Sequence, residues 1–279
     1  MYTEPTEASA LRRRLGRWYA REGRRLPWRT TRDPYAILVS EVMLQQTQVG
    51  RVLPAYRAFL ERFPTLRALS RATLADVLRA WSGLGYNRRA RDLHRIARAR
   101  GASLPRDVAS LDRLPGVGAY TAGAVACFAY GTRVAFADTN IRRVLGRIVL
   151  GRVATEREAI AIDAALMPRD AARWHHALMD LGATTCVSRA PRCDACPVAD
   201  SCRGRGRAVA ATPRRQTPFA ASDRRVRGRI VVLLRDHDTM TEAALRRELG
   251  DERVPRLVRA LASEGLVRRQ GRRVMLPEI

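Results

Sequence analysis

The stretch Leu114-Pro-Gly-Val-Gly-Ala-Tyr-Thr121 places two glycines between segments that have the apolar spacing of helices. Glycine permits a tight turn, and the backbone N–H groups at the start of the next helix can face a phosphate. The stretch therefore predicts two helices joined by a hairpin made of Pro115, Gly116, Val117 and Gly118. Such a hairpin holds a nucleic-acid backbone without reading its sequence, so by itself it indicates binding and not catalysis.

Helical spacing extends on both sides of the hairpin. Over residues 11–151, apolar side chains recur three or four positions apart, as in Ala36, Val39 and Val42. This period predicts α-helices, and residues 156–181 form a further helical stretch. Strand signals are scarce in this part of the chain, so we expect a mainly α fold.

The last quarter of the chain has a different composition. Residues 204–225 are rich in Arg, Ala, Gly, Thr and Pro without periodicity, which predicts a basic linker. We expect a second, small domain over residues 226–279. Its predicted elements are helices over 229–236, 241–249 and 254–264 and a hairpin over 266–276 that turns at Gly271. Three helices and a hairpin suggest a winged helix.

The charge of the chain indicates a polyanionic partner. Its 279 residues carry a net charge of +25, and all 52 basic residues are arginine because the sequence contains no lysine. Codon bias could explain the preference for arginine, but it does not explain the excess of positive charge. No apolar run approaches the roughly 20 residues that span a bilayer, and residues 1–10 do not resemble a signal peptide. We expect a monomeric, bacterial, cytoplasmic and nucleoid-associated protein with no membrane contact.

Four of the five cysteines form a cluster. Cys186, Cys193, Cys196 and Cys202 are separated by six, two and five residues, which places four soft ligands on one loop. Zinc is the common structural metal for four cysteines. The compact spacing favours a [4Fe–4S] cluster over zinc.

Two carboxylates stand out as candidates for catalysis. Glu41 lies at an expected helix start, where Ser40 could cap the helix and Glu41 could favour its dipole. Asp138 follows an apolar run and could equally cap a helix. Spacing alone does not decide between these structural roles and a catalytic pair.

A family resemblance bears on this choice. Several motifs, in this order, closely resemble the MutY-type adenine DNA glycosylases, relatives of endonuclease III in the helix-hairpin-helix superfamily. They are Pro27-Trp-Arg29, Asp33-Pro-Tyr35, Ser40-Glu-Val-Met-Leu-Gln-Gln-Thr-Gln-Val49, Arg62-Phe-Pro-Thr65, Trp81-Ser-Gly-Leu-Gly-Tyr86, Leu114-Pro-Gly-Val-Gly118, Asp138-Thr-Asn140 and the four cysteines. The resemblance covers residues 11–203. It implies a glycosylase domain over residues 1–203, built from a six-helix barrel module and an iron–sulfur module with its loop at 186–202.

The resemblance also implies a catalytic mechanism. Glu41 would protonate the flipped adenine, and an ionised Asp138 held by Asn140 would stabilise a positively charged sugar. Tyr120 matches a position near the sugar. Lyase relatives carry a lysine there as a Schiff-base nucleophile. This chain has no lysine, so we expect a monofunctional glycosylase unless the N-terminal amine substitutes.

Other positions are implied to contact double-stranded DNA that contains a mismatched or damaged pair. Gln45, Gln46 and Tyr86 match positions that enter the base stack, and Trp28 and Arg29 match positions that line the adenine pocket. Core packing is the alternative for Tyr86 and Trp28. The cysteine loop adds positive charge for the phosphates through Arg189, Arg192 and Arg203.

The sequence also departs from the family pattern. Residues 204–279 show no counterpart of the β-rich, Nudix-like domain that reads 8-oxoguanine in such enzymes, which puts that preference in doubt. Asn87 replaces a tyrosine. His176 stands where relatives place Gln or Glu against the base, and a neutral helix histidine is its alternative role.

Three functions remain open from sequence. The first is removal of adenine mispaired with guanine or 8-oxoguanine. The second is removal of thymine or uracil mispaired with guanine, because the sequence around Tyr120 resembles that of enzymes with this activity. The third is a non-enzymatic iron–sulfur DNA-binding protein, against which the presence of both Glu41 and Asp138 argues.

Overall fold

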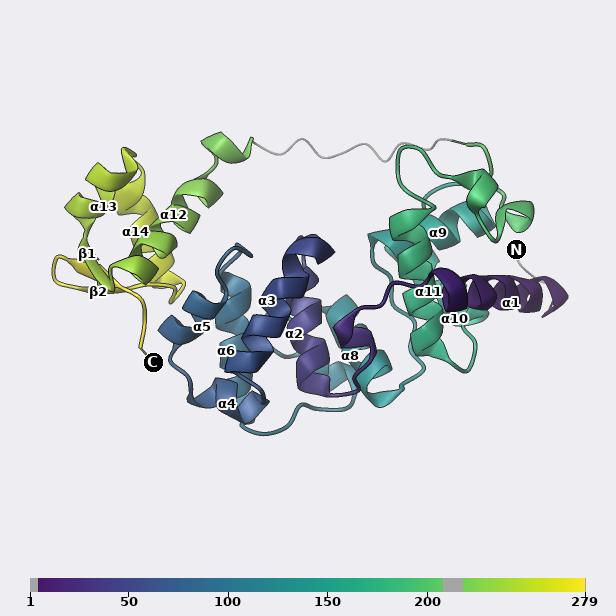
Figure 1. The fold of residues 1–279 in the computed structure, drawn as a ribbon, viewed down its shortest axis with the longest axis horizontal. Helices are drawn as coiled ribbons and strands as arrows, with labels where there is room; N and C mark the ends of the chain where they lie inside the picture. The colour runs from purple at the N-terminus through teal and green to yellow at the C-terminus, as the bar shows by residue number, and fades with distance from the viewer. Residues whose placement is uncertain (1–4, 208–217, 279) are drawn as a thin grey trace. The chain divides into compact units, whose positions relative to one another are not determined.

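The computed structural model describes residues 5–207 and 218–278 and is mainly helical, which confirms the predicted fold class (Figure 1). In these ranges the α-helices are α1 (Pro5–Glu22), α2 (Pro34–Leu44), α3 (Val49–Arg62), α4 (Leu66–Arg71), α5 (Leu74–Ala80), α6 (Arg88–Arg100), α7 (Val108–Asp112), α8 (Ala119–Tyr130), α9 (Thr139–Leu150), α10 (Glu156–Leu166), α11 (Ala171–Thr184), α12 (Asp223–Asp236), α13 (Glu242–Leu249) and α14 (Val254–Ser263). Short 3-10 helices occur at Pro27–Arg29, Cys193–Ala195, Ala199–Ser201 and Phe219–Ala221. None of the described helices is long and apolar enough to cross a membrane.

Local sequence signals explain several helix ends. Gly131 and Gly151 adopt left-handed conformations that end α8 and α9, as glycine does at helix C-termini. Thr155 and Glu158 form a capping box at the start of α10. Pro168 follows α10 and separates it from α11, so the helical stretch expected over 156–181 is two helices.

The expected helix start at Ser40 is wrong. Helix α2 begins at Pro34, because proline suits the first helical position and the Asp33 carboxylate accepts a hydrogen bond from the Tyr35 N–H. Ser40 is fully buried inside the helix, and Glu41 lies in its last turn. Glu41 therefore does not interact favourably with the helix dipole, which removes the structural role that the sequence offered for it.

The chain divides into two compact units. The first comprises Met1–Ile37, Arg106–Asp112 and Val117–Arg214, and the second comprises Leu38–Pro105, Arg113–Gly116 and Arg215–Ile279. Both units are therefore built from segments that are distant in sequence. Helix α2 and the hairpin after α7 each contribute residues to both.

In the first unit, α11 packs against α1 and α9, and α10 also packs against α9. Asp163 on α10 is fully buried. Its carboxylate accepts hydrogen bonds from Trp174 Nε1 at 2.7 Å and the Phe136 N–H at 3.3 Å, and it lies 2.7 Å from His175 Nε2. A buried carboxylate with three polar partners is stabilised where an isolated one would be costly, and it joins α10 to α11.

In the second unit, α6 packs against α4 and α5, and the C-terminal elements add to this core. The small sheet is antiparallel with strand order β1-β3-β2, from Thr239–Thr241, Arg273–Met275 and Arg268–Gln270. Helix α12 packs against α5, and the Ala75 N–H donates to the Pro277 carbonyl at 2.8 Å.

The C-terminal elements have the order of a winged helix, with a β2–β3 wing that turns at Gly271 (φ +57°). The sequence did not predict strand β1. Its three residues are extended because they pair with β3, which is distant in the sequence. The expected linker at 204–225 is partly helical, since α12 begins at Asp223. Arg253 and Arg256 both pair with Asp223, so tertiary contacts extend the helix into a segment of linker composition. Residues 208–217 of the expected linker lie outside the described residues.

Gly146 provides a test of packing in the first unit. A Cβ atom there would lie 2.3 Å from the Ala154 nitrogen and 2.5 Å from the Arg152 carbonyl oxygen, whereas one at Gly16 in α1 would have nothing within 4 Å. We expect Gly146→Ala to lower the free energy of unfolding by about 1–3 kcal/mol. Gly16→Ala should raise it by about 0.5–1 kcal/mol through helix propensity. Urea denaturation of the two variants measures both effects, and equal shifts would contradict the packing argument.

Candidate active site

Glu41 lies in the second unit, on the last turn of α2, and is 6% exposed. Burial and a helix C-terminus both disfavour a negative charge at this position. Glu41 is therefore a buried carboxyl group at the C-terminal end of a helix.

A buried arginine holds the residues that follow Glu41. Arg89 on α6 is 8% exposed, and its guanidinium donates to backbone carbonyls at the end of α2 and in the turn before α6. The acceptors are the carbonyls of Val42, Met43, Gln45, Leu84 and Gly85, and Thr47 Oγ1, at 2.5–3.2 Å. Burial lowers the pKa of Arg89 to about 10, so the group is protonated at neutral pH.

The two turns that Arg89 joins both contain strained backbone. Gln46 (φ +55°) and Tyr86 (φ +46°) adopt left-handed conformations that are uncommon for residues other than glycine. Tyr86 is 41% exposed, and the Arg89 guanidinium lies 5.3 Å from the centre of its ring. Strain of this kind persists only where the surroundings impose it, and it is concentrated at functional sites.

The glycine hairpin between α7 and α8 lies close to these turns. Gly116 has φ +72°, and a Cβ there would lie 3.1 Å from the Asp92 side chain, so the position favours glycine for two reasons. Gln45 Nε2 donates to the Gly116 carbonyl at 3.4 Å. Pro115, Gly116 and Gly118 are exposed, whereas Val117 is buried. The structure thus brings Gln45, Gly116 and Arg89 together within the second unit.

Asp138 lies in the first unit and caps α9. Its Oδ1 accepts from the Ile141 N–H at 2.7 Å, and its Oδ2 accepts from Asn140 Nδ2 at 2.8 Å. Asn140 accepts in turn from Arg143, which also donates to the carbonyls of Gly182 and Cys186. The cap and the Asn140 contact together orient the carboxylate on both oxygens, so the structural role and a catalytic role do not exclude each other.

Aromatic rings connect Tyr120 with His176. Tyr120 packs edge-on against Phe136, Phe136 packs edge-on against Phe128, and His176 stacks on Phe128 with ring centres 4.3 Å apart. Burial, and then the positive charge of Arg29, lower the pKa of His176 to about 3. His176 is therefore neutral at neutral pH.

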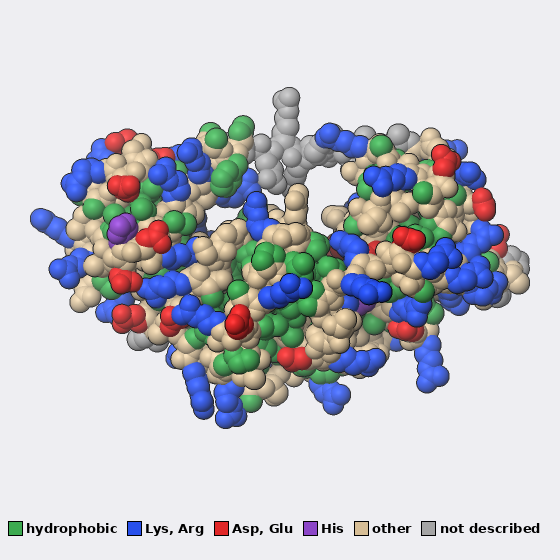
Figure 2. All heavy atoms as spheres, in the orientation of Figure 1, with side chains coloured by type: hydrophobic (Ala, Val, Ile, Leu, Met, Phe, Trp, Pro, Cys, Tyr) green, Lys and Arg blue, Asp and Glu red, His purple; other side chains and the backbone are tan. Residues whose placement is uncertain are grey.

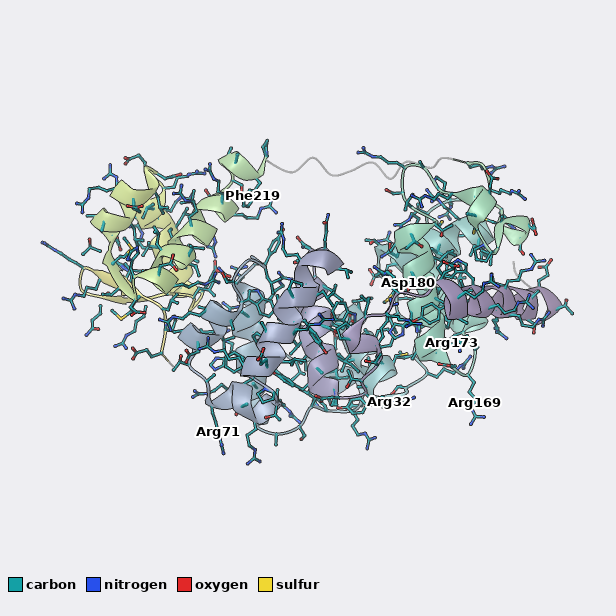
Figure 3. The ribbon with its side chains drawn as sticks, in the orientation of Figure 1. Arg32, Arg71, Arg169, Arg173, Asp180 and Phe219 are labelled. Atoms are coloured by element: carbon teal, nitrogen blue, oxygen red, sulfur yellow. The ribbon has the colours of Figure 1, made fainter. Side chains whose placement is uncertain are left out.

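Trp28 and Arg29 come from the 3-10 helix at Pro27–Arg29, and Trp28 is 6% exposed. Arg29 forms a two-point ion pair with the fully buried Asp180 of α11, marked in Figure 3, at 2.7 and 2.8 Å. Arg24 adds two hydrogen bonds to the same carboxylate. Burial opposes ionisation of Asp180, but Arg29 and Arg24 outweigh it and lower its pKa.

The cysteine loop is attached to α9. The buried Arg147 donates to the carbonyls of Val187 and Ser188 and lies 3.4 Å from Cys186 Sγ. At the other end of the loop, the Gly204 N–H donates to the Arg147 carbonyl at 3.0 Å. Helix α9 therefore fixes both ends of the cysteine segment.

The donor chemistry of this loop fits an iron–sulfur cluster. Cys186, Cys193, Cys196 and Cys202 are free thiols. Burial raises the pKa of Cys196 to about 11, and the other three thiols raise it further. Across residues 5–207 and 218–278, no group of three or more His, Cys, Asp or Glu residues is placed so that it could hold a metal ion.

Comparison with known proteins identifies the family. Residues 39–167 match the HhH-GPD superfamily of base excision DNA repair proteins. The chain is 48% identical over 240 residues to the adenine DNA glycosylase of Mycolicibacterium smegmatis, a match that covers 82% of each chain. It is 38% identical to the human adenine DNA glycosylase, covering 74% of this chain and 41% of the human protein. The chain belongs to the adenine DNA glycosylase family.

Solved structures of the wider superfamily share the fold. A thermostable thymine-DNA glycosylase matches with a TM-score of 0.66 and 28% identity, over 71% of this chain and 96% of that one. Endonuclease III in a non-covalent DNA complex matches with a TM-score of 0.60 and 23% identity, over 71% and 95% of the two chains. As a member of the adenine DNA glycosylase family, this chain is an enzyme of base excision repair.

Sequence analysis missed three residues that organise the site of this family member: Arg89, Arg143 and Asp180. Arg89 shares the inner face of α6 with Leu93 and Ile96, so an arginine in an apolar helical stripe was the available signal. Arg143 and Asp180 carry no comparable signal, because the carbonyls of Gly182 and Cys186 that accept from Arg143, and the arginines that pair with Asp180, lie far away in the sequence.

Arg89 allows a direct test of how the turns are held. Arg89→Met would leave several buried carbonyls without donors, and we expect it to lower the free energy of unfolding by about 3 kcal/mol or more. Arg89→Lys keeps the charge but cannot span both turns, so we expect a smaller loss of stability. Arg57→Met, at an exposed position on α3, is the control. Urea denaturation measures all three, and equal stability of the Arg89→Met variant and the control would refute the role of Arg89.

Proposed function

We propose that the chain hydrolyses the N-glycosidic bond of adenine mispaired with guanine or 8-oxoguanine in duplex DNA, acting as a monomer. Identity of 47–48% to mycobacterial proteins named adenine DNA glycosylase carries this proposal. The hairpin, the exposed Gln46 and Tyr86 and the net charge of +25 support binding to duplex DNA.

In the proposed reaction, Glu41 and Asp138 act on one extruded nucleotide. Glu41 gives a proton to the base as the bond between C1′ and the base nitrogen breaks and its electron pair moves to the base. Asp138, oriented by Asn140 and the α9 backbone, stabilises the positive charge left on the sugar. Water then adds its oxygen to C1′ and gives one proton to the Glu41 carboxylate, which restores the acid. The products are free adenine and an abasic site.

The remaining site residues receive supporting roles. Gln45, Gln46 and Tyr86 fill the space that the extruded base leaves. Trp28 and the Asp180-held Arg29 line the base pocket, with the neutral His176 and Tyr120 beside it. An uncharged His176 can accept or donate one hydrogen bond without attracting a competing anion. With no lysine in the sequence, the reaction stops at the abasic site.

A panel of duplexes tests this proposal. Single-turnover release should be fastest from A:G or A:8-oxoguanine pairs. Release only from T:G or U:G pairs would instead support the second candidate, favoured by the 28% identity to a thymine-DNA glycosylase.

Two substitutions test the catalytic pair. Glu41→Gln should lower the rate of adenine release by about 10²–10⁴-fold, and Asp138→Asn by about 10²–10³-fold. Glu22→Gln removes an exposed acid and is the matched control. Full activity of Glu41→Gln would refute its role as the acid.

We also propose that Cys186, Cys193, Cys196 and Cys202 hold a [4Fe–4S] cluster as thiolates. The cluster would join the two ends of the loop and take no part in cleavage. The exposed Arg189, Arg192 and Arg203 would then present positive charge to DNA phosphates.

Metal analysis tests the cluster. The purified chain should contain iron and acid-labile sulfide in equal amounts, and Cys196→Ser should lose both and unfold at a lower temperature. Cys127→Ser is the control, because this fifth cysteine lies buried on α8 and outside the loop. Zinc without sulfide would refute the cluster.

A further inference from the structure

A cavity of about 650 Å³ lies in the second unit between α6 and the C-terminal elements. We call it the α6–wing groove. Its apolar lining includes Leu74, Val267 and Pro277. Its basic lining consists of Arg91, Arg95, Arg98, Arg268 and Arg269, and no Asp or Glu lines it. It is a concave surface with one sign of charge.

Two of these five arginines are neutralised by neighbours. Arg91 forms an ion pair with Asp92 at 2.7 Å and also donates to the Glu264 carbonyl. Arg269 forms an ion pair with Glu242 at 2.9 Å. Their charges are therefore committed to the structure of the protein.

The other three arginines have no such partner. Arg95, Arg98 and Arg268 are exposed, and no described residue pairs with their guanidinium groups. His94, which also lines the groove, is held neutral because burial lowers its pKa and the nearby Arg98 lowers it further. Three positive charges thus face one cavity without a counter-charge among the described residues.

Arginines close to the groove, unlike the three that face it, are paired with carboxylates. Where the C-terminal elements meet α5 and α6, other arginines are paired: Arg79 with Asp238, and Arg88 and Arg227 with Glu264. The interface therefore uses carboxylates to compensate positive charge. Uncompensated like charges repel and lower stability, so a bound anion would stabilise the groove.

The basic surface continues beyond the groove. Arg272 and Arg273 lie on the same wing as Arg268, and both are exposed; in the β2–β3 register Arg273 is opposite Gln270 and Arg268 is opposite Met275. Arginine side chains also project from the visible face of the C-terminal elements, interspersed with acidic ones (Figure 2). A ligand with one charge would satisfy only part of this surface, whereas a phosphodiester chain offers a charge at every nucleotide.

We propose that the α6–wing groove binds the phosphodiester backbone of duplex DNA, beyond the nucleotides held by the hairpin. Guanidinium groups bind phosphate oxygens through two parallel hydrogen bonds, and Arg95, Arg98 and Arg268 present three such groups. The C-terminal elements then extend the DNA-binding surface without reading bases. This proposal rests on duplex DNA as the partner and is independent of which base the enzyme removes.

The experiment compares two triple variants of the full chain. Arg95→Ala/Arg98→Ala/Arg268→Ala removes the unpaired charges of the groove. Arg57→Ala/Arg67→Ala/Arg71→Ala removes the same charge from exposed positions on α3 and α4, where Arg71 extends from the ribbon in Figure 3. Arg95→Gln/Arg98→Gln is a milder variant that preserves the polarity of α6. Circular dichroism and urea denaturation establish that each variant folds.

Fluorescence anisotropy then measures affinity for a 30-base-pair duplex at several salt concentrations. Each lost phosphate contact should reduce the slope of log K against log [salt] by about 0.9. We expect the groove triple variant to lose about 2–3 units of slope and to bind on the order of 10²-fold more weakly at 0.1 M salt. The α6 double variant should lose about 1–2 units, and the control less than 1. The single-turnover cleavage rate at saturating enzyme should stay unchanged, which separates this result from a failure of the proposed catalysis.

Three outcomes would overturn the proposal. Equal losses in the groove variant and the control would show that only net charge matters. A wild-type slope in the groove variants would show that DNA does not enter the groove. Groove-dependent binding of a nucleoside triphosphate or of a polyglutamate peptide, with DNA binding unchanged, would assign the groove to a free nucleotide or to an acidic protein.

Discussion

The two turns at 45–47 and 84–86 of the second unit depend on one buried guanidinium. Burying the charge of Arg89 costs several kcal/mol by desolvation, a cost that only a well-formed set of acceptors can offset. Five backbone carbonyls and one hydroxyl supply that set, and they come from the end of α2 and from the turn before α6. Because the acceptors lie on two separate segments, the ion can be satisfied only when both segments are in place. The strained conformations of Gln46 and Tyr86 are maintained by the same requirement.

Arginine has a similar role in the first unit. Arg143 connects Asn140, and through it Asp138, to the carbonyls of Gly182 and Cys186, and Arg147 holds the next residues of the cysteine loop. Arg29 and Arg24 converge on Asp180 in the same way. Each contact needs several donors in a fixed planar arrangement, which an ammonium group does not provide. The exclusive use of arginine therefore has structural consequences in the core as well as on the surface.

The sequence was informative where a residue acts on its own neighbourhood. Glycines predicted the hairpin at 114–118 and the wing turn at Gly271, and helical spacing predicted the mainly α fold, because both depend on local backbone preferences. The family followed from motifs that the comparisons support. The individual roles of Glu41, Asp138 and the other site residues stay predictions.

Sequence reasoning failed where distant segments decide the outcome. Ser40 has the residue type of a helix cap, but Asp33 and Pro34 provide a better start six residues earlier, so Ser40 is buried within the helix. Residues 223–225 were predicted to be part of the linker, yet Arg253 and Arg256 pair with Asp223 and α12 begins there. Arg89 was overlooked because a charged residue in an apolar stripe is normally assigned to the surface. Its acceptors lie up to 47 positions away in the sequence.

Tyr86 is also contacted by the C-terminal elements. Two guanidinium groups lie near the ring of Tyr86, Arg89 at 5.3 Å and Arg224 of α12 at 6.0 Å from its centre, and Arg224 also donates to its hydroxyl at 2.8 Å. A cation–π contact at an exposed position contributes only about 0.5–1 kcal/mol. The contact with Arg224 therefore orients the exposed ring but is too weak to fix it in one position. The buried Arg89 holds the backbone of the turn, whereas the exposed Arg224 orients only the side chain of Tyr86.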